Sequence, residues 1–252
     1  LPLIIYFLHL FWAKAQWRWL FGAGALFAIQ TIGNHAFTIP IVSFTIALYM
    51  VLWAAVHWGR TLELGRRLRF DRRAAACAVG IVILFAAMAM MVGAARDPGT
   101  RQIGMLRQAD DTVSLQTFLT YAGNTDVAKW NELFLGVSPA LDFSLYFGLL
   151  GFALAVVGLL GASGAGRVVR AVAVMLFLFS VGSVVSVAVY YGWPLMKFYR
   201  HLALISPLVK LWLCFLAGFG LEMLVKKPGE KEGVRPLWYA VAIGVLLMSG
   251  CY

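Results

Sequence analysis

The chain has 252 residues, of which 62% are hydrophobic and 13% are charged. Water-soluble domains carry about 25% charged residues, so this composition excludes an ordinary soluble protein. The formal net charge of +10 suggests nucleic-acid binding, but the basic residues lie in short connectors beside apolar segments. In that position they set membrane topology and contact membrane lipids, so we expect no nucleic-acid partner.

Long apolar segments recur along the chain, and most approach or exceed the ~20 residues that a helix needs to cross a bilayer. Eight are predicted to span the membrane: residues 1–13, 17–32, 37–57, 74–95, 144–162, 171–192, 202–225 and 236–252. The expected fold class is therefore all-α, a polytopic transmembrane helical bundle. Because Leu1 and Tyr252 both fall within apolar runs, we expect a single transmembrane domain over 1–252 that is a fragment of a longer protein.

The distribution of Lys and Arg predicts which way the bundle faces. If the connector 58–73 is cytoplasmic, most of the 21 basic residues fall on the cytoplasmic side, as the positive-inside rule requires. The residues predicted to be cytoplasmic are Lys14, Arg18, Arg60, Arg66, Arg67, Arg69, Arg72, Arg73, Arg167, Arg170, Lys226, Lys227, Lys231 and Arg235. The opposite orientation would reverse this bias.

A long polar segment, residues 96–142, is predicted to be an extracytoplasmic loop. It opens on Asp97-Pro98-Gly99, a turn signal that ends the preceding helix. Within it, 114–121 and 130–137 are mildly apolar and aromatic, which predicts short interfacial helices or a fold back into a vestibule. Connectors of this length are usually functional, so we expect this loop to form the roof of any site on the outer side.

Three basic residues follow in a short outer connector. Lys197, Arg200 and His201 have i, i+3, i+4 spacing, which places them on one face if the seventh helix starts early. Such a cluster beside a helix N-terminus suits a lipid phosphate. The alternative is an interfacial anchor, in which these bases and the aromatic rings of Trp193 and Tyr199 lie among the lipid headgroups.

Lys210 is a charged residue inside a predicted span. On a continuous helix it would lie roughly 15 Å deeper than Arg200, and Pro207 would kink that helix nearby. A lysine at that depth costs at least ~2.5 kcal/mol, so we expect it to face a cavity or the substrate. The alternative is a lysine that snorkels or pairs within the bundle.

Asp110, Asp111 and His35 are further candidates on the outer side. Adjacent carboxylates can act as a general base or bind a divalent cation, which leaves such a cation open as a cofactor. A solvated surface pair is the common alternative, and an interfacial position is the alternative for His35. The three cysteines have no ligand spacing, so no metal site is predicted.

Three stretches together resemble the bacterial YfhO-like membrane proteins, relatives of the GT-C class of glycosyltransferases. The turn 31–37 is similar to a Gly-His-Pro-Gln-like segment of that family, although the Pro-Gln is missing. Residues 145–150 resemble the family's entry into a span after its long outer loop. Phe198-Tyr199-Arg200-His201, followed by the Leu-Ala-Gly-Phe-Gly of 216–220, resembles the family's F-R-x-P … LAGLG segment.

The resemblance implies a glycosyltransferase in the bacterial cytoplasmic membrane that uses a polyprenyl-phosphate-linked sugar donor at the outer face. The implied acceptor is a cell-envelope polymer, glycolipid or protein. Arg200 lies on the matching motif and is the expected contact for the donor phosphate. The main catalytic acid of such proteins lies in the first outer loop, which we expect upstream of Leu1.

Two other functions remain open from the residues. One is a transporter or flippase of a charged lipid or solute, with Lys210 as the coupling or substrate charge. The other is a non-catalytic subunit with membrane-protein partners. Internal repeats would favour a transporter and are not evident, whereas the long outer loop favours an enzyme.

Overall fold

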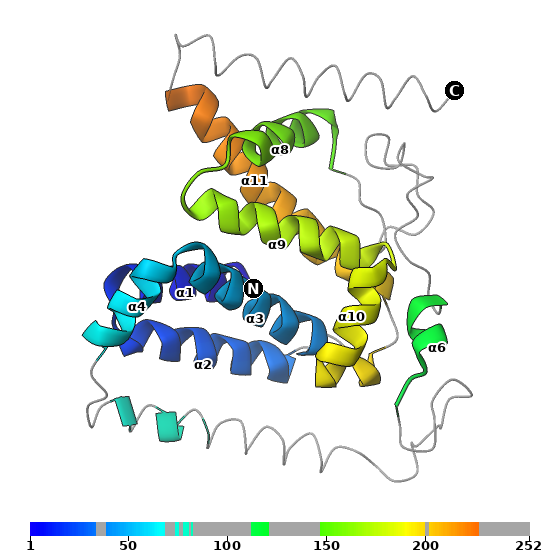
Figure 1. Ribbon diagram of the computed structural model, residues 1–252, viewed down its shortest axis with the longest axis horizontal. Helices are drawn as coiled ribbons and strands as arrows, with labels where there is room; N and C mark the ends of the chain where they lie inside the picture. The colour runs from blue at the N-terminus through cyan, green and yellow to red at the C-terminus, as the bar shows by residue number, and fades with distance from the viewer. Residues whose placement is uncertain are drawn as a thin grey trace. The chain divides into compact units, whose positions relative to one another are not determined.

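The computed structural model describes residues 1–33, 39–68, 74–75, 78–80, 82, 112–120, 147–199 and 202–226. The regular elements in these ranges are all helices, so the predicted all-α class is confirmed for this part of the chain (Figure 1). The chain divides into two compact units, Leu1–Arg107 and Gln108–Tyr252. The single transmembrane domain stays a prediction.

The first unit begins with a helical hairpin. Its described helices are α1 (Pro2–Lys14), α2 (Trp17–Gly33), α3 (Ile39–Val56) and α4 (Trp58–Arg67). Ala15 adopts a left-handed conformation with φ 52°, and its N–H donates to the carbonyl of Phe11 at 2.9 Å. This bond closes α1 and turns the chain into α2, so that the two helices pack along each other.

Aromatic rings around Trp53 join α1 to α3. The Trp53 ring stacks on His57 with centroids 4.5 Å apart and on Trp12 at 6.2 Å, and it meets His9 edge-on at 5.2 Å. Tyr49 lies one turn earlier on α3 at 5.9 Å. Since Trp53 is only 6% exposed, this cluster is a core of the unit, and aromatic pairs of this kind add to the stability that burial gives.

The connector 58–73, expected to be a loop, contains the helix α4. One face of α4 carries Leu64, which is buried, whereas Trp58 and Leu62 are exposed. Arg66 and Arg67 close its last turn, where cations interact favourably with the helix dipole. An amphipathic basic helix with an exposed tryptophan is typical of a helix that lies on a membrane surface.

The second unit is built around the crossing of two apolar helices. Its described elements are α6 (Leu115–Thr120), α8 (Leu149–Gly161), α9 (Ala165–Ser180), α10 (Val184–Gly192), the 3-10 turns η4 (Pro194–Phe198) and η5 (Leu202–Ile205), and α11 (Ser206–Lys226). Helices α8 and α11 pack against each other, and α11 also packs against α9 (Figure 1).

Two glycines let the backbones of α8 and α11 touch. A Cβ atom on Gly158 would lie 2.0 Å from the carbonyl oxygen of Leu216, and one on Gly220 would lie 2.0 Å from that of Leu154. No other residue fits at either position without moving the helices apart. Small residues at such crossings are typical of membrane helices, which associate by close backbone packing.

The number of spans is smaller than predicted. In the described ranges, two helices are long and apolar enough to cross a membrane, Ile39–Val56 and Ser206–Val225. A third span results if α8 and α9 are counted together, although they are bent by 120° at their junction. The prediction of eight spans is therefore wrong for this part of the chain, where the count is two or three.

Helix length explains most of the difference. Helices α1, α2 and α8 have 13, 17 and 13 residues, fewer than the ~20 that a straight span needs. The run 171–192 is broken at Gly182, which has φ 77°, and at Ser183, whose Oγ accepts from the N–H of Val185 and caps α10. The predicted span 236–252 and most of 74–95 lie outside the described residues.

Candidate functional site

Part of the long connector is fixed onto the loop that carries Lys197. The N–H of Val113 donates to the carbonyl oxygen of Lys197 at 2.7 Å, and the Tyr190 hydroxyl donates to the carbonyl of Val113 at 2.6 Å. Val113 and Tyr190 are both buried. The connector is thus held at the buried Val113 by two hydrogen bonds, one that it accepts from Tyr190 of α10 and one that it donates to Lys197 of η4.

The short helix α6 follows directly and packs by one aromatic side chain. Phe118 is fully buried, with its ring centroid 5.2 Å from that of Tyr190 and 6.2 Å from that of Phe179. Ser114 begins the helix, since its Oγ accepts from the N–H of Thr117 at 3.2 Å. The helix predicted over 114–121 is therefore confirmed, and the one predicted over 130–137 lies outside the described residues.

Lys197 is exposed in η4, beside the anchored connector. Helix η4 ends at Phe198, Tyr199 is extended with φ −102° and ψ 135°, and α11 begins only at Ser206. An early start of the seventh helix, on which the shared helical face depended, is therefore wrong. Pro194 at the start of η4 has no N–H to donate and lies in a tight 3-10 turn. Arg200 and His201 themselves lie outside the described residues.

Tyr199 is a packing residue of this loop. Its side chain is 1% exposed, and burial raises the pKa of its hydroxyl. Its backbone N–H donates to the carbonyl of Met196, which is also buried. The alternative interpretation of Tyr199 as an anchor among lipid headgroups is therefore wrong.

Lys210 lies nearer to the start of its helix than predicted. It is in the second turn of α11, about 6 Å along the axis from Ser206. Pro207 is the second residue of α11 and so begins the helix without kinking it, because the first turn needs no backbone N–H there. The Lys210 side chain is half-buried and makes no ion pair with any residue described.

The remaining candidates from the sequence are two acidic residues and one histidine. Asp110, Asp111 and His35 lie outside the described residues, so their roles as base, cation ligand or vestibule residue stay predictions. Within the described ranges, no group of three or more His, Cys, Asp or Glu side chains could hold a metal ion.

Sequence reasoning missed the residues that fix the loop. Tyr190 and Val113 are separated by 77 residues along the chain, and each is an ordinary member of an apolar or mixed segment. Nothing in spacing or composition links them. The hydrogen bond between Tyr190 and Val113 could be found only from the structure, in which α10 packs beside the connector.

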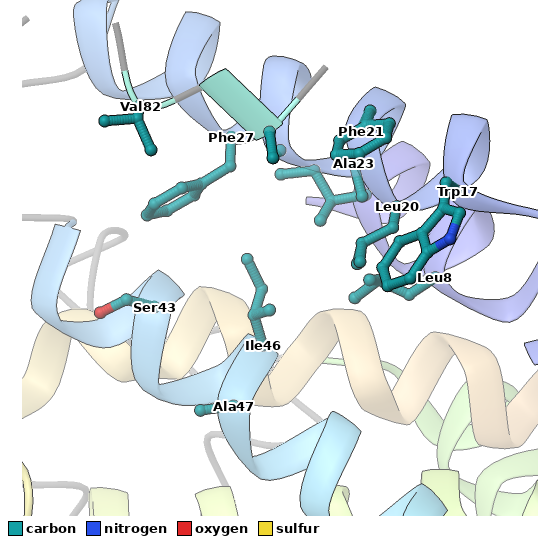
Figure 2. A pocket seen from close by; sticks show the side chains of 13 residues that line it. Leu8, Trp17, Leu20, Phe21, Ala23, Phe27, Ser43, Ile46, Ala47 and Val82 are labelled. Atoms are coloured by element: carbon teal, nitrogen blue, oxygen red, sulfur yellow. The ribbon is translucent and has the colours of Figure 1, made fainter. Parts of the chain in front are cut away.

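A separate apolar cavity of about 550 Å³ lies within the first unit. Figure 2 shows side chains from α1, α2 and α3 converging on it, with Trp17 and Leu8 at one end and Phe27 and Val82 at the other. Ser43 is the one lining residue with a polar side chain besides Trp17, and its hydroxyl donates to the carbonyl of Pro40 at 3.1 Å. The cavity therefore presents apolar surface to whatever fills it.

No family model, curated protein or solved structure matches the chain. The resemblance to YfhO-like proteins thus rests on the residues quoted for it and stays a prediction.

Proposed function

We propose that the chain belongs to an integral-membrane glycosyltransferase of GT-C type. In this proposal a polyprenyl-phosphate-linked sugar is the donor, and a cell-envelope molecule is the acceptor at the outer face of the bacterial cytoplasmic membrane. The observation that carries the proposal is the hydrogen bond from Val113 to Lys197. It attaches the long connector to the chain segment that contains the three predicted phosphate-binding residues.

The chemistry of that segment suits a departing phosphate. Lys197 offers an exposed ammonium group, and Arg200 follows three residues later with a planar guanidinium that can bind two phosphate oxygens. Positive charge at this position would stabilise the anion that forms when the bond between the sugar and the phosphate breaks. The donor phosphate is therefore assigned to Lys197, Arg200 and His201.

The transfer itself also needs a base. An ionised carboxylate takes the proton of the acceptor hydroxyl, the acceptor oxygen bonds to the anomeric carbon, and the polyprenyl phosphate leaves with the bonding electrons. Asp110 and Asp111 are our candidates for this role within the chain, and they immediately precede Thr112 in the sequence.

The burial of Phe118 and Tyr190 supports an ordered segment 112–120 beside Lys197. A loop anchored by two hydrogen bonds at the buried Val113 and by an aromatic cluster loses little further entropy when substrate binds. A freely moving loop would lose much more. This is the structural reason for preferring a binding site here over a simple headgroup anchor.

Native mass spectrometry of the full chain in mild detergent tests the proposal. Wild type incubated with polyprenyl phosphate should retain one lipid, whereas Arg200→Ala and Lys197→Ala should retain little. Arg167→Ala, in the first turn of α9, is the matched control and should retain the lipid as wild type does. Equal retention by wild type and Arg200→Ala would remove the phosphate site and, with it, the proposed function.

A further inference from the structure

We propose that the apolar cavity of the first unit is a lipid site. One acyl chain of an anionic phospholipid fills the cavity, and the phosphate headgroup lies against Lys14 and Arg18. The site lies in the unit Leu1–Arg107, so it does not rest on the donor site proposed for the second unit.

The lining of the cavity selects an apolar occupant. The side chains that face it are almost entirely hydrocarbon, including Leu8, Leu20, Phe27 and Ile46 (Figure 2). The hydroxyl of Ser43 already has a partner in the carbonyl of Pro40. Water would find few hydrogen-bond partners on this lining, whereas an alkyl chain would bury apolar surface on both sides.

The length of the cavity matches one leaflet of a bilayer. Trp17 and Phe27 mark its two ends on α2, and ten residues of helix rise about 15 Å. The hydrocarbon core of a bilayer is about 30 Å thick, so a single acyl chain from one leaflet covers the same distance. The third helix that lines the cavity, α3, is one of the two candidate spans, which places such a cavity at hydrocarbon depth.

Two cations stand at the Trp17 end. The Nζ of Lys14 lies 5.2 Å from the centroid of the Trp19 ring, and the Cζ of Arg18 lies 4.8 Å from it. Both side chains are exposed, and cation–π contacts hold them over one indole. Trp19 in turn meets Phe7 of α1 edge-on at 5.6 Å, so the two charges are tied to the α1–α2 hairpin.

Charge complementarity decides which lipid fits. The positive side chains of Lys14 and Arg18, which flank the lining residue Trp17 in sequence, attract a phosphate that carries net negative charge, and a zwitterionic headgroup gains less. The predicted orientation places Lys14 and Arg18 on the cytoplasmic side, where the leaflet is anionic. An interfacial tryptophan beside them marks the headgroup level. The apolar lining of the cavity, its length along α2 and the positive charges of Lys14 and Arg18 thus all favour an anionic phospholipid of the inner leaflet.

Native mass spectrometry of the full chain, incubated with phosphatidylglycerol or phosphatidylcholine, tests this site. Wild type should retain one phosphatidylglycerol in preference to phosphatidylcholine, and Lys14→Gln with Arg18→Gln should reduce that preference by roughly tenfold. Ala47→Phe, which fills the cavity, should lower retention of both lipids. Val51→Phe is its control, because Val51 lies one turn further along α3, is 64% exposed and does not line the cavity.

Three results would overturn the proposal. Equal retention of both lipids by wild type would remove the headgroup contact, and undiminished retention in Ala47→Phe would remove the cavity as the acyl site. A lipid-free dimer that Ala47→Phe dissociates would show that a second copy of the chain fills the cavity. The double glutamine variant changes only exposed side chains, so it keeps the test decisive if Ala47→Phe fails to fold.

Discussion

Gly158→Ala is the substitution that most directly tests the crossing of α8 and α11. The added methyl group would lie 2.0 Å from the carbonyl oxygen of Leu216, whereas real Cβ atoms essentially never come within 3.0 Å of another atom. The helices must therefore separate by about 1 Å or more. Overpacking costs ~1–3 kcal/mol, and we expect about 3 kcal/mol here because a backbone carbonyl cannot rotate out of the way.

The assay is thermal unfolding of the full chain in detergent, followed by circular dichroism. Gly218→Ala is the matched control, since Gly218 lies on α11, the other helix of the crossing, and an added methyl group there would have no atom within 4 Å. It should stabilise the protein by up to ~1 kcal/mol, because alanine favours a helix more than glycine does. If Gly158→Ala were as stable as wild type, the glycine-mediated crossing would be refuted.

Two further predictions concern the anchored connector and the aromatic cluster. Tyr190→Phe leaves the buried carbonyl of Val113 without its 2.6 Å hydrogen bond and should cost ~1–3 kcal/mol. In Tyr190→Phe, hydrogen exchange should become faster at the backbone amides of α6, and an unchanged exchange rate there would contradict the anchor. The control is Tyr191→Phe, at a side chain that is 64% exposed, and its α6 amides should exchange as those of wild type do. Trp53→Ala removes the centre of four ring contacts and should lower the free energy of unfolding by ~3–5 kcal/mol. Trp58→Ala, at a 62% exposed side chain, should change it by no more than ~0.5 kcal/mol, and equal effects in the thermal melts would count against the cluster.

The sequence predicted the helical class correctly because its long apolar runs favour helices. It predicted the spans less well, since hydropathy measures the length of an apolar run and not the length of a helix. The run 171–192 reads as one span, yet Gly182 and Ser183 divide it by a positive φ and a side-chain cap. The connector 58–73 was not expected to contain a helix, because its high charge is typical of a loop. Only the structure shows that α4 is amphipathic, with Leu64 on its buried face.

In the candidate site too, features that depend on neighbouring residues could be predicted, whereas contacts between residues far apart in the chain could not. The sequence predicted the helix at 114–121, which is confirmed, and the phosphate role of Lys197, which stays a prediction. The structure places the connector against the loop of Lys197 at Val113. The partner of Val113, Tyr190, could not be predicted, since the contact depends on how α10 folds against a distant segment. Pro207 was expected to kink a helix because that helix was predicted to begin at residue 202. It begins at Ser206, so Pro207 lies in its first turn.

The glycines of 216–220 illustrate why a motif needs a structure. In the sequence they contribute to a family resemblance. In the fold, a Cβ atom added at Gly220 would clash with the backbone of α8, whereas one added at Gly218 would meet nothing within 4 Å. Packing alone therefore explains one of the two glycines. The proposed phosphate site rests on the basic residues before α11 and not on this stretch.

Both proposed sites depend on the predicted orientation of the chain, with Lys197 outside and Arg60 inside. Single cysteines at these two positions, in a chain whose three native cysteines are replaced by serine, can be labelled in intact bacterial cells with a membrane-impermeant maleimide. Lys197 is exposed in η4 and Arg60 is exposed in α4, so neither position is shielded by packing. Our account predicts that Lys197→Cys is labelled in intact cells and that Arg60→Cys is labelled only after the membrane is permeabilised. Labelling of Arg60→Cys but not Lys197→Cys in intact cells would contradict it.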